Sequence, residues 1–506
     1  MLFNSYTFLI AFLPLVVVGF LLLRQAPYRA GVCWLVLASL VYYGWWNPAD
    51  LWVIGASCVA NFLFGRHLAG HRRSAAGKAM LTLGVTANLA LLGWFKYSGL
   101  FAKTLVALGG DPGSFVALAL PLGLSFFTFQ QIAYLVDAFR GETEEYHFTD
   151  YLLFVTFFPQ LVAGPIVHHR EIMPQFRQRW TGWHRHLPVA IGFLAIGLFK
   201  KVVIADNAAL VANPLFHFAA HGDRALTMVE AWIAATSYGL QIYFDFSGYS
   251  DMAIGAARLF GIRLPVNFHS PYKAASVVDF WRRWHITLSR FLRDYLYIPL
   301  GGSRCGRVRR YGNLLLTMLL GGFWHGAGWT FLLWGGLHGI YLCVNHGWRW
   351  LRQNLAAPAI PKPLGVALTF IAVMVAWVPF RAGNFELAPG GSAADAWAAT
   401  RSILGPMFGF AGFEGWPAKA NRIVATAEPL KLLPALLACW LLPNTQEIFR
   451  RYRPAQFPDR RDAPARSPRR RYHWRPTWPF ALATVLLMVV IGLEFDKVSE
   501  FIYFQF

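Results

Sequence analysis

Apolar stretches alternate with shorter polar segments along almost the whole chain of 506 residues. Twelve of them are long enough, or nearly long enough, to cross a bilayer as a helix. They lie at about 1–23, 31–47, 51–65, 78–95, 115–138, 187–204, 228–246, 312–325, 329–347, 364–380, 428–443 and 479–495. This pattern predicts an all-α polytopic membrane protein with about 11 or 12 transmembrane helices. We expect the whole chain, 1–506, to form a single integral-membrane domain.

Two segments interrupt this succession of simple spans. The apolar segment "YLLFVTFFPQLVAGPI" (151–166) ends just after Gly164-Pro165. It therefore predicts a re-entrant half-helix, because broken backbone is tolerated at membrane depth only where protein or a cavity surrounds it. Residues 451–476 are rich in Arg and Pro. They predict a solvated cytoplasmic loop.

A third unusual segment, "VVDFWRRWHITLSRFLRDYLYIPL" (277–300), has an amphipathic pattern. At 100° per residue, one arc of about 100° holds four basic residues, Arg282, Arg283, Arg290 and Arg293. The opposite side holds six apolar or aromatic residues: Trp281, Trp284, Leu288, Phe291, Leu292 and Tyr295. The pattern predicts one helix that lies in the membrane surface with its basic face toward the cytoplasm. Pro299 and the glycines after it end the helix.

Basic charge is concentrated in particular loops. The net charge is +21, and the segments 250–310 and 450–475 together supply +16 of it. The loops 66–78, 164–186 and 349–362 are basic as well. An N-terminus outside, followed by twelve crossings, places all of these loops on one face. The positive-inside rule assigns that face to the cytoplasm and leaves the C-terminus outside.

Composition narrows the functional classes. Hydrophobic residues make up 56% of the chain and charged residues only 14%, whereas a soluble protein carries about a quarter charged residues. Basic charge beside membrane spans indicates topology, so the expected surroundings are a lipid bilayer and no nucleic-acid partner is expected. The five cysteines form no CxxC or His/Cys metal spacing, and no metal site is expected. Signatures of nucleotide hydrolysis, serine hydrolases and zinc peptidases do not occur.

His325 is the strongest candidate for chemistry. It stands in "GGFWHGAGWT" (321–330), after an apolar segment too short to cross the full bilayer. Ionisable groups at such a depth are costly and tend to be functional. Gly326 and its neighbouring glycines would let a backbone or a ligand approach, and Trp324 and Trp329 would exclude water. His325 is then either a general base or a helix-packing histidine that is bonded to a carbonyl group.

Two further histidines flank this candidate. His285 lies at the border of the apolar face of 277–300. It is either a second histidine at the same cavity or an interfacial residue whose ring reaches the lipid headgroups. His338 is thirteen residues beyond His325, a rotation of about 220° on a helix. We therefore expect His338 to have a packing role.

Charged residues near these histidines allow two interpretations each. Asp245 and Asp251 stand at the end of the span 228–246, where they either cap a helix or line the cytoplasmic mouth of a cavity. Arg282 and Arg283 belong to a basic cluster that serves as a topology signal and phospholipid anchor. The same cluster could also dock the phosphates of a donor or an acidic carrier protein.

Several long motifs together resemble the membrane-bound O-acyltransferase family. They are "FWRRWHITLSRFLRDYLYIPLGGSR" (280–304) and "GGFWHGAGWTFLLWGGLHG" (321–339). The pieces "FPQLVAGPI" (158–166), "YFDFSGYSDMAIG" (243–255) and "FIYFQF" (501–506) resemble the alginate O-acetyltransferase membrane-subunit type in particular. The resemblance runs from the first span to the last residue, apart from the loops 384–426 and 451–476.

The resemblance implies a fold, a reaction and partners. The fold is a ring of membrane helices around a central tunnel, and the family's two catalytic histidines correspond to His325 and His285. The protein would take an acetyl group from a cytoplasmic thioester, acetyl-CoA or an acyl carrier protein, with no tightly bound cofactor. A periplasmic acetyltransferase partner would then O-acetylate an exopolysaccharide such as alginate, or a cell-wall glycan. The location implied is the bacterial inner membrane, with the C-terminus in the periplasm.

Two other functions compete with acyl transfer. A flippase or channel would move a glycan or an acylated precursor without chemistry, but the spans contain few of the charged residues that such a path needs. A membrane scaffold would recruit other synthesis proteins through its loops. Substitution of His325 distinguishes the three functions. It is expected to abolish acyl transfer by an enzyme, to slow transport by a flippase or channel, and to leave a scaffold unaffected.

Overall fold

The computed structural model describes ten stretches of the chain: 1–110, 118–144, 146–178, 183–222, 225–355, 358–388, 391–410, 428–457, 473–495 and 501–502. Within these stretches the regular structure is helical, apart from an isolated β-bridge between Pro265 and Gln456. The all-α prediction is confirmed for this part of the chain.

The N-terminal third forms two groups of packed helices. Its elements are η1 (Thr7–Phe12), α1 (Leu13–Leu22), α2 (Tyr28–Gly44), α3 (Asp50–Gly70), α4 (Ala75–Ala107) and α5 (Leu124–Arg140). Helix α1 packs on α2, and α3 packs on both α4 and α5. The side chain of Ser74 caps α4 by accepting the amide hydrogen of Gly77 at 3.0 Å, which satisfies one of the free donors of the first turn.

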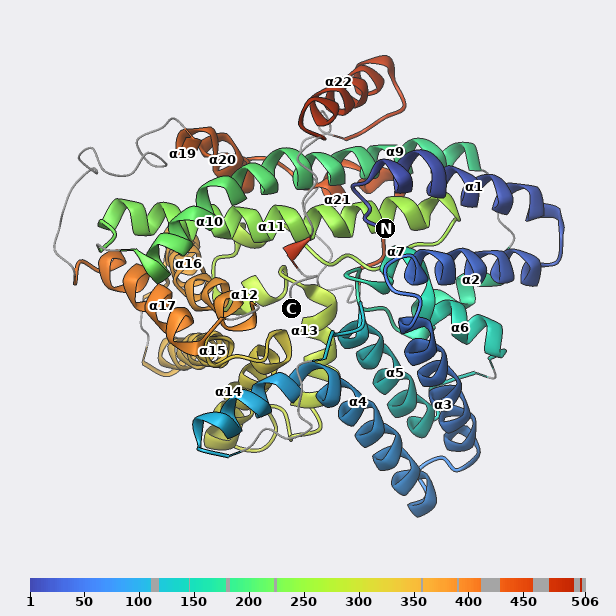
Figure 1. Ribbon diagram of the computed structural model, residues 1–506, viewed down its shortest axis with the longest axis horizontal. Coiled ribbons are helices and arrows are strands. Elements are labelled where there is room, and N and C mark those ends of the chain that lie inside the picture. Colours follow the sequence, from blue (N-terminus) through green and yellow to red (C-terminus); the bar gives the residue numbers. More distant parts are fainter. Residues whose placement is uncertain are drawn as a thin grey trace.

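A central layer crosses the whole molecule (Figure 1). It consists of α9 (Trp183–Leu198), the π-helical η3 (Phe199–Ala205) and α10 (Asp206–His221), which continue one another, and of α11 (Met228–Leu259) alongside them. Helices α9 and α11 touch backbone to backbone, because a Cβ atom on Gly248 would lie 2.8 Å from the carbonyl oxygen of Gly197. Nearly all residues of α11 are buried, so this helix is the axis of the core.

The C-terminal half adds a second group of helices and several short ones. The long helices are α14 (Arg307–His325), α15 (Trp329–Leu355), α16 (Lys362–Leu387), α17 (Ala393–Met407) and α22 (Trp478–Glu494). The short ones are α19 (Glu428–Lys431), α20 (Leu433–Leu441) and α21 (Thr445–Ile448). Helix α14 packs along α15, α15 along α16, and α16 along α17. In Figure 1 the helices α14–α17 and the group α1–α3 lie at opposite sides of the molecule.

Every predicted span coincides wholly or partly with a helix. Five helical stretches are long and apolar enough to cross a membrane, namely Thr7–Gln25, Asp50–Gly70, Ala75–Val106, Arg185–His221 and Lys362–Leu387. The predicted span 115–138 has its helix only from Leu124 onward, and 428–443 holds the two short helices α19 and α20 instead of one span. The number of crossings stays a prediction.

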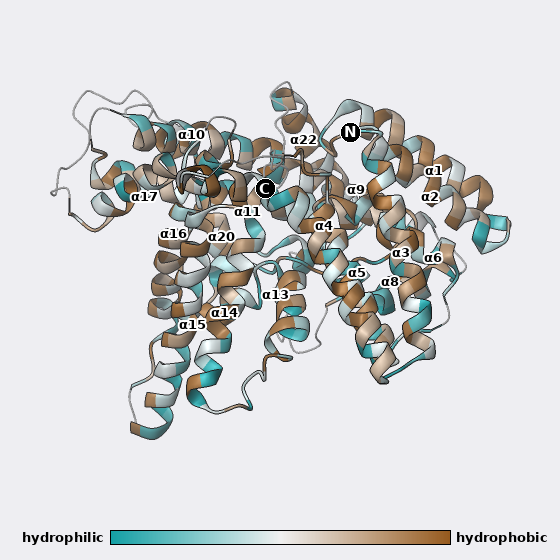
Figure 2. Ribbon diagram, turned by 60° about the horizontal axis from the view of Figure 1, so that its bottom comes forward, coloured by the Kyte–Doolittle hydropathy of each residue, from teal (hydrophilic) through white to brown (hydrophobic). Residues whose placement is uncertain are grey.

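The outer surface of the helices is apolar. Leu15 is 65% exposed, Trp52 83%, Leu368 50% and Val485 58%. Figure 2 shows hydrophobic residues along most of the helices and hydrophilic residues at the lower ends of α14 and α15. An apolar exterior of this extent is unsuited to water and suited to lipid. The protein is a multi-pass membrane protein.

The segment 277–300 is not one helix. It is divided into α12 (Val277–Trp281), α13 (Ile286–Leu292) and the π-helical η5 (Arg293–Tyr297). The amides of Arg283 and Trp284 still donate to the carbonyl of Phe280 in the preceding turn, but two other backbone groups at the break bond to a neighbouring extended segment. The amide of His269 donates to the carbonyl of Arg283 at 2.9 Å, and the amide of Ile286 donates to the carbonyl of Asn267 at 2.9 Å.

The burial of this segment also corrects the prediction. Trp281, Trp284 and Leu288 are buried, as the amphipathic pattern predicts. However, Ile286 and Thr287 are buried as well. The burial of Ile286 and Thr287 thus corrects the one-sided burial that the pattern predicts, whereas Arg293 and Ile298 are exposed. The location of the segment at the membrane surface stays a prediction.

The predicted re-entrant segment has the broken backbone that the sequence indicates. It contains α6 (Phe148–Thr156) and α7 (Phe158–Leu161), followed by non-helical backbone that leads to α8 (His169–Phe176). This backbone is buried, and its polar groups find partners inside the protein. The amide of Phe158 donates to the hydroxyl of Ser39 at 3.1 Å, and the amide of Ile166 donates to Thr287 Oγ1 at 3.0 Å. Most of the predicted loop 451–476, residues 458–472, lies outside the described residues.

Candidate active site

His325 is the last residue of α14 and lies inside the protein. Its exposed fraction is 4%. Three aromatic rings surround the imidazole, with centroid distances of 4.8 Å to Trp324, 5.0 Å to Trp334 and 5.2 Å to Phe380. The chain leaves the helix at Gly326, whose backbone is extended. The ring is thus presented at a helix end within an apolar, water-poor environment.

The glycines around His325 make room for the protein itself. A Cβ atom on Gly335 would lie 2.3 Å from the carbonyl oxygen of Met318, so α14 and α15 can pack only because that atom is missing. A Cβ atom on Gly326 would lie 2.2 Å from the ring of Phe331. Gly326 therefore accommodates Phe331, so that the close approach expected of a backbone or a ligand is made here by a side chain of the protein.

His285 is the break point between α12 and α13. Its backbone has φ 42° and ψ 54°, the left-handed conformation that non-glycine residues rarely adopt. The side chain is 0% exposed, so the alternative of a ring reaching the lipid headgroups is wrong. The His285 ring lies 4.8 Å from the Phe246 ring, and its Nδ1 is 3.1 Å from Asn267 Oδ1. Because an amide oxygen can only accept, Nδ1 carries the proton in this arrangement.

The fold brings three histidines of distant sequence positions together. His285 and His338 both lie close enough to His325 to act electrostatically on it. His338 packs between Trp281, at a centroid distance of 5.1 Å, and Trp334, at 4.9 Å. This aromatic packing agrees with its predicted role. Neither of its ring nitrogens has a hydrogen-bond partner within the described part of the chain.

A cavity of about 690 Å³ opens next to this cluster. Its walls come from 278–298 and from the halves of α14 and α15 that adjoin the basic loops, which is the predicted cytoplasmic side. Three arginines line it, Arg282, Arg290 and Arg293, together with apolar side chains such as Met318. Trp281 lines the cavity and packs 5.9 Å from Trp334, which in turn contacts His325. Trp281 and Trp334 therefore link the wall of the cavity to the imidazole by direct ring contacts.

The remaining predicted site residues are divided between site and scaffold. Trp324 is 6% exposed, stacks on Phe129 at 4.9 Å and contacts His325, and its role in excluding water stays a prediction. Trp329 is 51% exposed, and the prediction that it excludes water from the site is wrong. Arg283 does not line the cavity; its Nε binds Asp279 at 2.8 Å.

Asp245 and Asp251 are buried inside α11 and hold the scaffold together. Asp245 pairs with Lys201 at 2.8 Å and accepts the amide hydrogen of Ile502 at 3.0 Å. Asp251 pairs with Lys200 at 2.5 Å and accepts the hydroxyl hydrogen of Thr445 at 2.6 Å. Both interpretations from the sequence are corrected, since α11 continues to Leu259 and neither residue lines the cavity.

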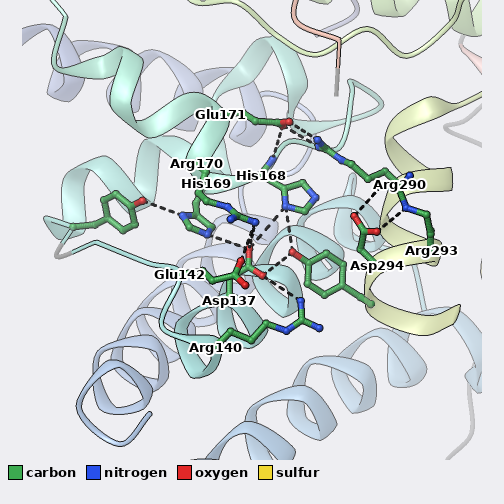
Figure 3. A network of polar contacts seen from close by, with 12 residues as sticks. Asp137, Arg140, Glu142, His168, His169, Arg170, Glu171, Arg290, Arg293 and Asp294 are labelled. Atoms are coloured by element: carbon green, nitrogen blue, oxygen red, sulfur yellow. Dashed lines mark hydrogen bonds and ion pairs between the residues drawn. The ribbon is translucent and has the colours of Figure 1, made fainter. Parts of the chain in front are cut away.

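A polar network anchors the broken segment 277–297 to α5 and α8 (Figure 3). The hydroxyl of Tyr295 donates to Asp137 Oδ1 at 2.9 Å, and His169 Nε2 lies 3.1 Å from the other oxygen of the same carboxylate. Arg290 makes a two-bond contact with Glu171, in which Nη2 donates to Oε2 at 2.9 Å. The arginine wall of the cavity is thereby fixed to the rest of the protein.

Several residues of the site were not identified from the sequence. Asn267, Trp281 and Trp334 are ordinary in sequence context, and only the fold places them beside the histidines. Lys96 of α4 could have been identified from the sequence, because a lone lysine within an apolar membrane helix is energetically costly and tends to have a function. No group of three His, Cys, Asp or Glu residues in the described stretches is arranged to hold a metal ion.

Fold and site together define an integral membrane protein with clustered, buried imidazoles beside a basic cavity. Residues 79–380 match the model of the membrane-bound O-acyltransferase family. The chain is 45% identical to the peptidoglycan O-acetyltransferase of Helicobacter pylori, over 77% of this chain and 78% of that protein. It is 43% identical to the probable alginate O-acetylase of Azotobacter vinelandii, over 77% and 76% of the two chains.

Similarity to a relative also extends over the full length of both chains. The probable alginate O-acetylase of Pseudomonas putida is 35% identical to this chain over 100% of both proteins. The chain belongs to the membrane-bound O-acyltransferase family. It is a membrane-embedded O-acyltransferase, in agreement with the resemblance of its histidine motifs.

Proposed function

We propose that this protein takes an acetyl group from a cytoplasmic thioester and passes it across the membrane for O-acetylation of a glycan, with His325 as the catalytic residue. The observation that supports this best is the position of His325. It is buried near His285, and contacts through Trp334 and Trp281 link its ring to the wall of a cavity with three arginines. The imidazole is thus held at membrane depth, next to an opening on the predicted cytoplasmic side.

His325 can serve acyl transfer in two ways. As a general base it would remove the proton of the accepting hydroxyl while that oxygen attacks the acyl carbon of the thioester and the thiol leaves. As a nucleophile it would carry the acyl group briefly on nitrogen before the hydroxyl takes it. His285 would orient the substrate or share the proton, since Asn267 fixes one of its ring nitrogens.

The cavity supports a donor with phosphate groups. Guanidinium groups bind phosphate through paired N–H donors. Arg282, Arg290 and Arg293 line this space, and Arg290 and Arg293 also pair with Glu171 and Asp294. Acetyl-CoA has such phosphates, and so does the arm of an acyl carrier protein. The apolar walls near Trp281 and Met318 suit the less polar end of a thioester arm. We propose acetyl-CoA or an acyl carrier thioester as the donor substrate.

The acceptor is proposed from the relatives. Two of them are named for alginate and one for peptidoglycan, so an exopolysaccharide or cell-wall glycan is the expected end product. Such glycans lie outside the cytoplasmic membrane, and a periplasmic acetyltransferase partner would complete the transfer. The bacterial inner membrane and a periplasmic C-terminus follow from this proposal and from the basic loops.

The test is acetyl transfer by purified protein in liposomes. Radiolabelled acetyl-CoA is added to the cytoplasmic face, and label is measured on a soluble glycan acceptor supplied on the opposite face with its partner protein. We expect His325→Ala to lower the transfer rate by about 10³-fold, the middle of the range for loss of a general base. The matched control is His217→Ala, an exposed histidine on α10.

Two outcomes would contradict the proposal. Retention of a tenth or more of the transfer rate in His325→Ala would exclude a catalytic imidazole at this position. Passage of an acylated precursor across the membrane without any covalent exchange of label would instead favour a flippase or channel.

A further inference from the structure

Lys96 of α4 is a cation inside an otherwise apolar membrane helix. The stretch Ala75–Val106 has the length and hydropathy of a membrane span. Lys96 makes no ion pair with a carboxylate within the described residues. A charge in this setting is costly, so its presence calls for a compensating role.

The ammonium group of Lys96 binds the end of α14. Its Nζ donates to the carbonyl oxygen of Trp324 and, at 3.2 Å, to that of His325. It also lies 5.5 Å above the ring of Trp324. The adjacent hydroxyl of Tyr97 donates to the carbonyl of Phe323 at 2.9 Å, and the Tyr97 and Phe323 rings stack at 4.3 Å.

These carbonyl groups are the ones that α14 leaves without internal partners. The last four carbonyls of a helix have no amide ahead of them to accept from. The extended backbone at Gly326 ends α14 abruptly, without a glycine-type cap that would satisfy them. A cation at this end also interacts favourably with the helix dipole. Two consecutive residues of α4 therefore cap the turn whose last residue is His325.

We propose that Lys96 is a positioning residue, which fixes the last turn of α14 and so aims the imidazole of His325 at the reacting groups. This inference rests on the proposed function of His325. Lys96 acts through the backbone of α14 and does not itself touch substrate. Displacement of a catalytic group by about 1 Å can lower turnover by about 10²-fold, so loss of this cap is expected to act mainly on turnover.

The experiment compares Lys96→Met and Lys96→Arg in the acetyl-transfer assay. Methionine fills a similar volume without the charge, so the variant is expected to fold. We expect Lys96→Met to lower kcat by about 10²-fold with little change in KM for the donor. Lys96→Arg keeps a cationic donor within reach and is expected to stay within about 10-fold of the wild type.

A matched control variant and a second measurement test the role of Lys96 independently of the proposed catalytic function. Lys103 of α4 also binds backbone carbonyls, those of Glu386 at 3.0 Å and Gly391 at 3.1 Å. Lys103→Met removes a contact of the same kind away from His325 and is expected to keep its kcat. Amide hydrogen exchange of peptides covering 320–328 needs no enzymatic activity, and it should become faster in Lys96→Met but not in Lys103→Met.

The outcomes are distinguishable. An inactive wild-type protein would contradict the proposed function. The contact of Lys96 with the end of α14 would then still be tested by the hydrogen-exchange measurement. If Lys96→Met kept half of the wild-type kcat, or showed unchanged exchange at 320–328, the positioning role would be overturned. Equal loss of kcat in Lys96→Arg and Lys96→Met would overturn it too, because a cationic donor would then not be what matters.

Discussion

His285 shows how much of this site is decided at single residues. Its left-handed backbone is rare for a residue with a side chain, and such conformations persist only where surrounding structure imposes them. Asn267 supplies that structure twice, since its carbonyl accepts the amide of Ile286 and its side chain meets the imidazole. The orientation of the second histidine thus depends on one asparagine.

Removal of the Asn267 side chain should therefore impair turnover more than binding. In Asn267→Ala the His285 ring loses the partner that fixes its Nδ1, and we expect kcat for acetyl transfer to fall by about 10-fold. Steady-state kinetics with the labelled thioester would measure this. Ser250→Ala is the control, because Ser250 contacts only the far side of the Asn267 amide, at 3.4 Å. An unchanged kcat in Asn267→Ala would show that His285 needs no fixed orientation.

The sequence revealed the two histidines but not their supports. An imidazole in an apolar segment is conspicuous because it is costly there, so His325 and His285 could be found without a structure. Asn267, Trp281 and Trp334 have no such signal. They matter through contacts with residues that are distant in the sequence, and these contacts exist only in the folded chain.

At the scale of elements, the segment 277–300 shows that helical periodicity in the sequence does not always predict a continuous helix. Its apolar and basic residues do repeat as on a helix, and the burial of Trp281, Trp284 and Leu288 follows that repeat. The helix is interrupted where Asn267 and His269 bond to the amide of Ile286 and the carbonyl of Arg283. Pairing between distant segments overrides local helical preference here.

The Arg290–Glu171 contact is expected to stabilise this element. Glu171→Gln leaves the partly buried guanidinium without its carboxylate, so we expect the free energy of unfolding to fall by about 3 kcal/mol. Thermal unfolding in detergent would detect the change. Asp294→Asn is the control, because the Arg293–Asp294 pair joins neighbouring residues near solvent and should contribute less than about 1 kcal/mol. Equal effects of the two substitutions would contradict the anchoring role.

The same contact gives a pH dependence. Burial alone would raise the pKa of Glu171, but the hydrogen bonds and charge of Arg290 outweigh it and hold the pKa below its usual value. A lowered carboxyl pKa contributes stability above the unfolded value, about 4.3, that is lost as the pH falls further. The difference in melting temperature between wild type and Glu171→Gln should therefore shrink below that pH.

For the whole molecule, orientation in the membrane follows from the distribution of charge. The basic loops lie on one face if the N-terminus is outside, and the arginine-lined cavity opens among these same loops. A donor from the cytoplasm and an acceptor outside would then approach His325 from opposite faces.

Cysteine labelling would check this orientation. In a background without native cysteines, Leu108→Cys, 81% exposed beyond α4, should react with an impermeant maleimide added to intact spheroplasts. Val308→Cys, 87% exposed among the arginines that begin α14, should react only after permeabilisation. The reverse pattern would place the cavity outside and contradict a cytoplasmic donor.

The sequence by itself determined the helical class, the positions of the apolar segments and the broken backbone after 151, and it singled out the two histidines as candidates. These follow from local physics, because the bilayer admits only helices with satisfied backbones and penalises every ionisable group. Only the tertiary structure decided the rest. It moved Asp245 and Asp251 into buried ion pairs, broke 277–300 and placed Lys96 on the end of α14. Each of these depends on a partner that is distant along the chain, and hydropathy and periodicity contain no information about such partners.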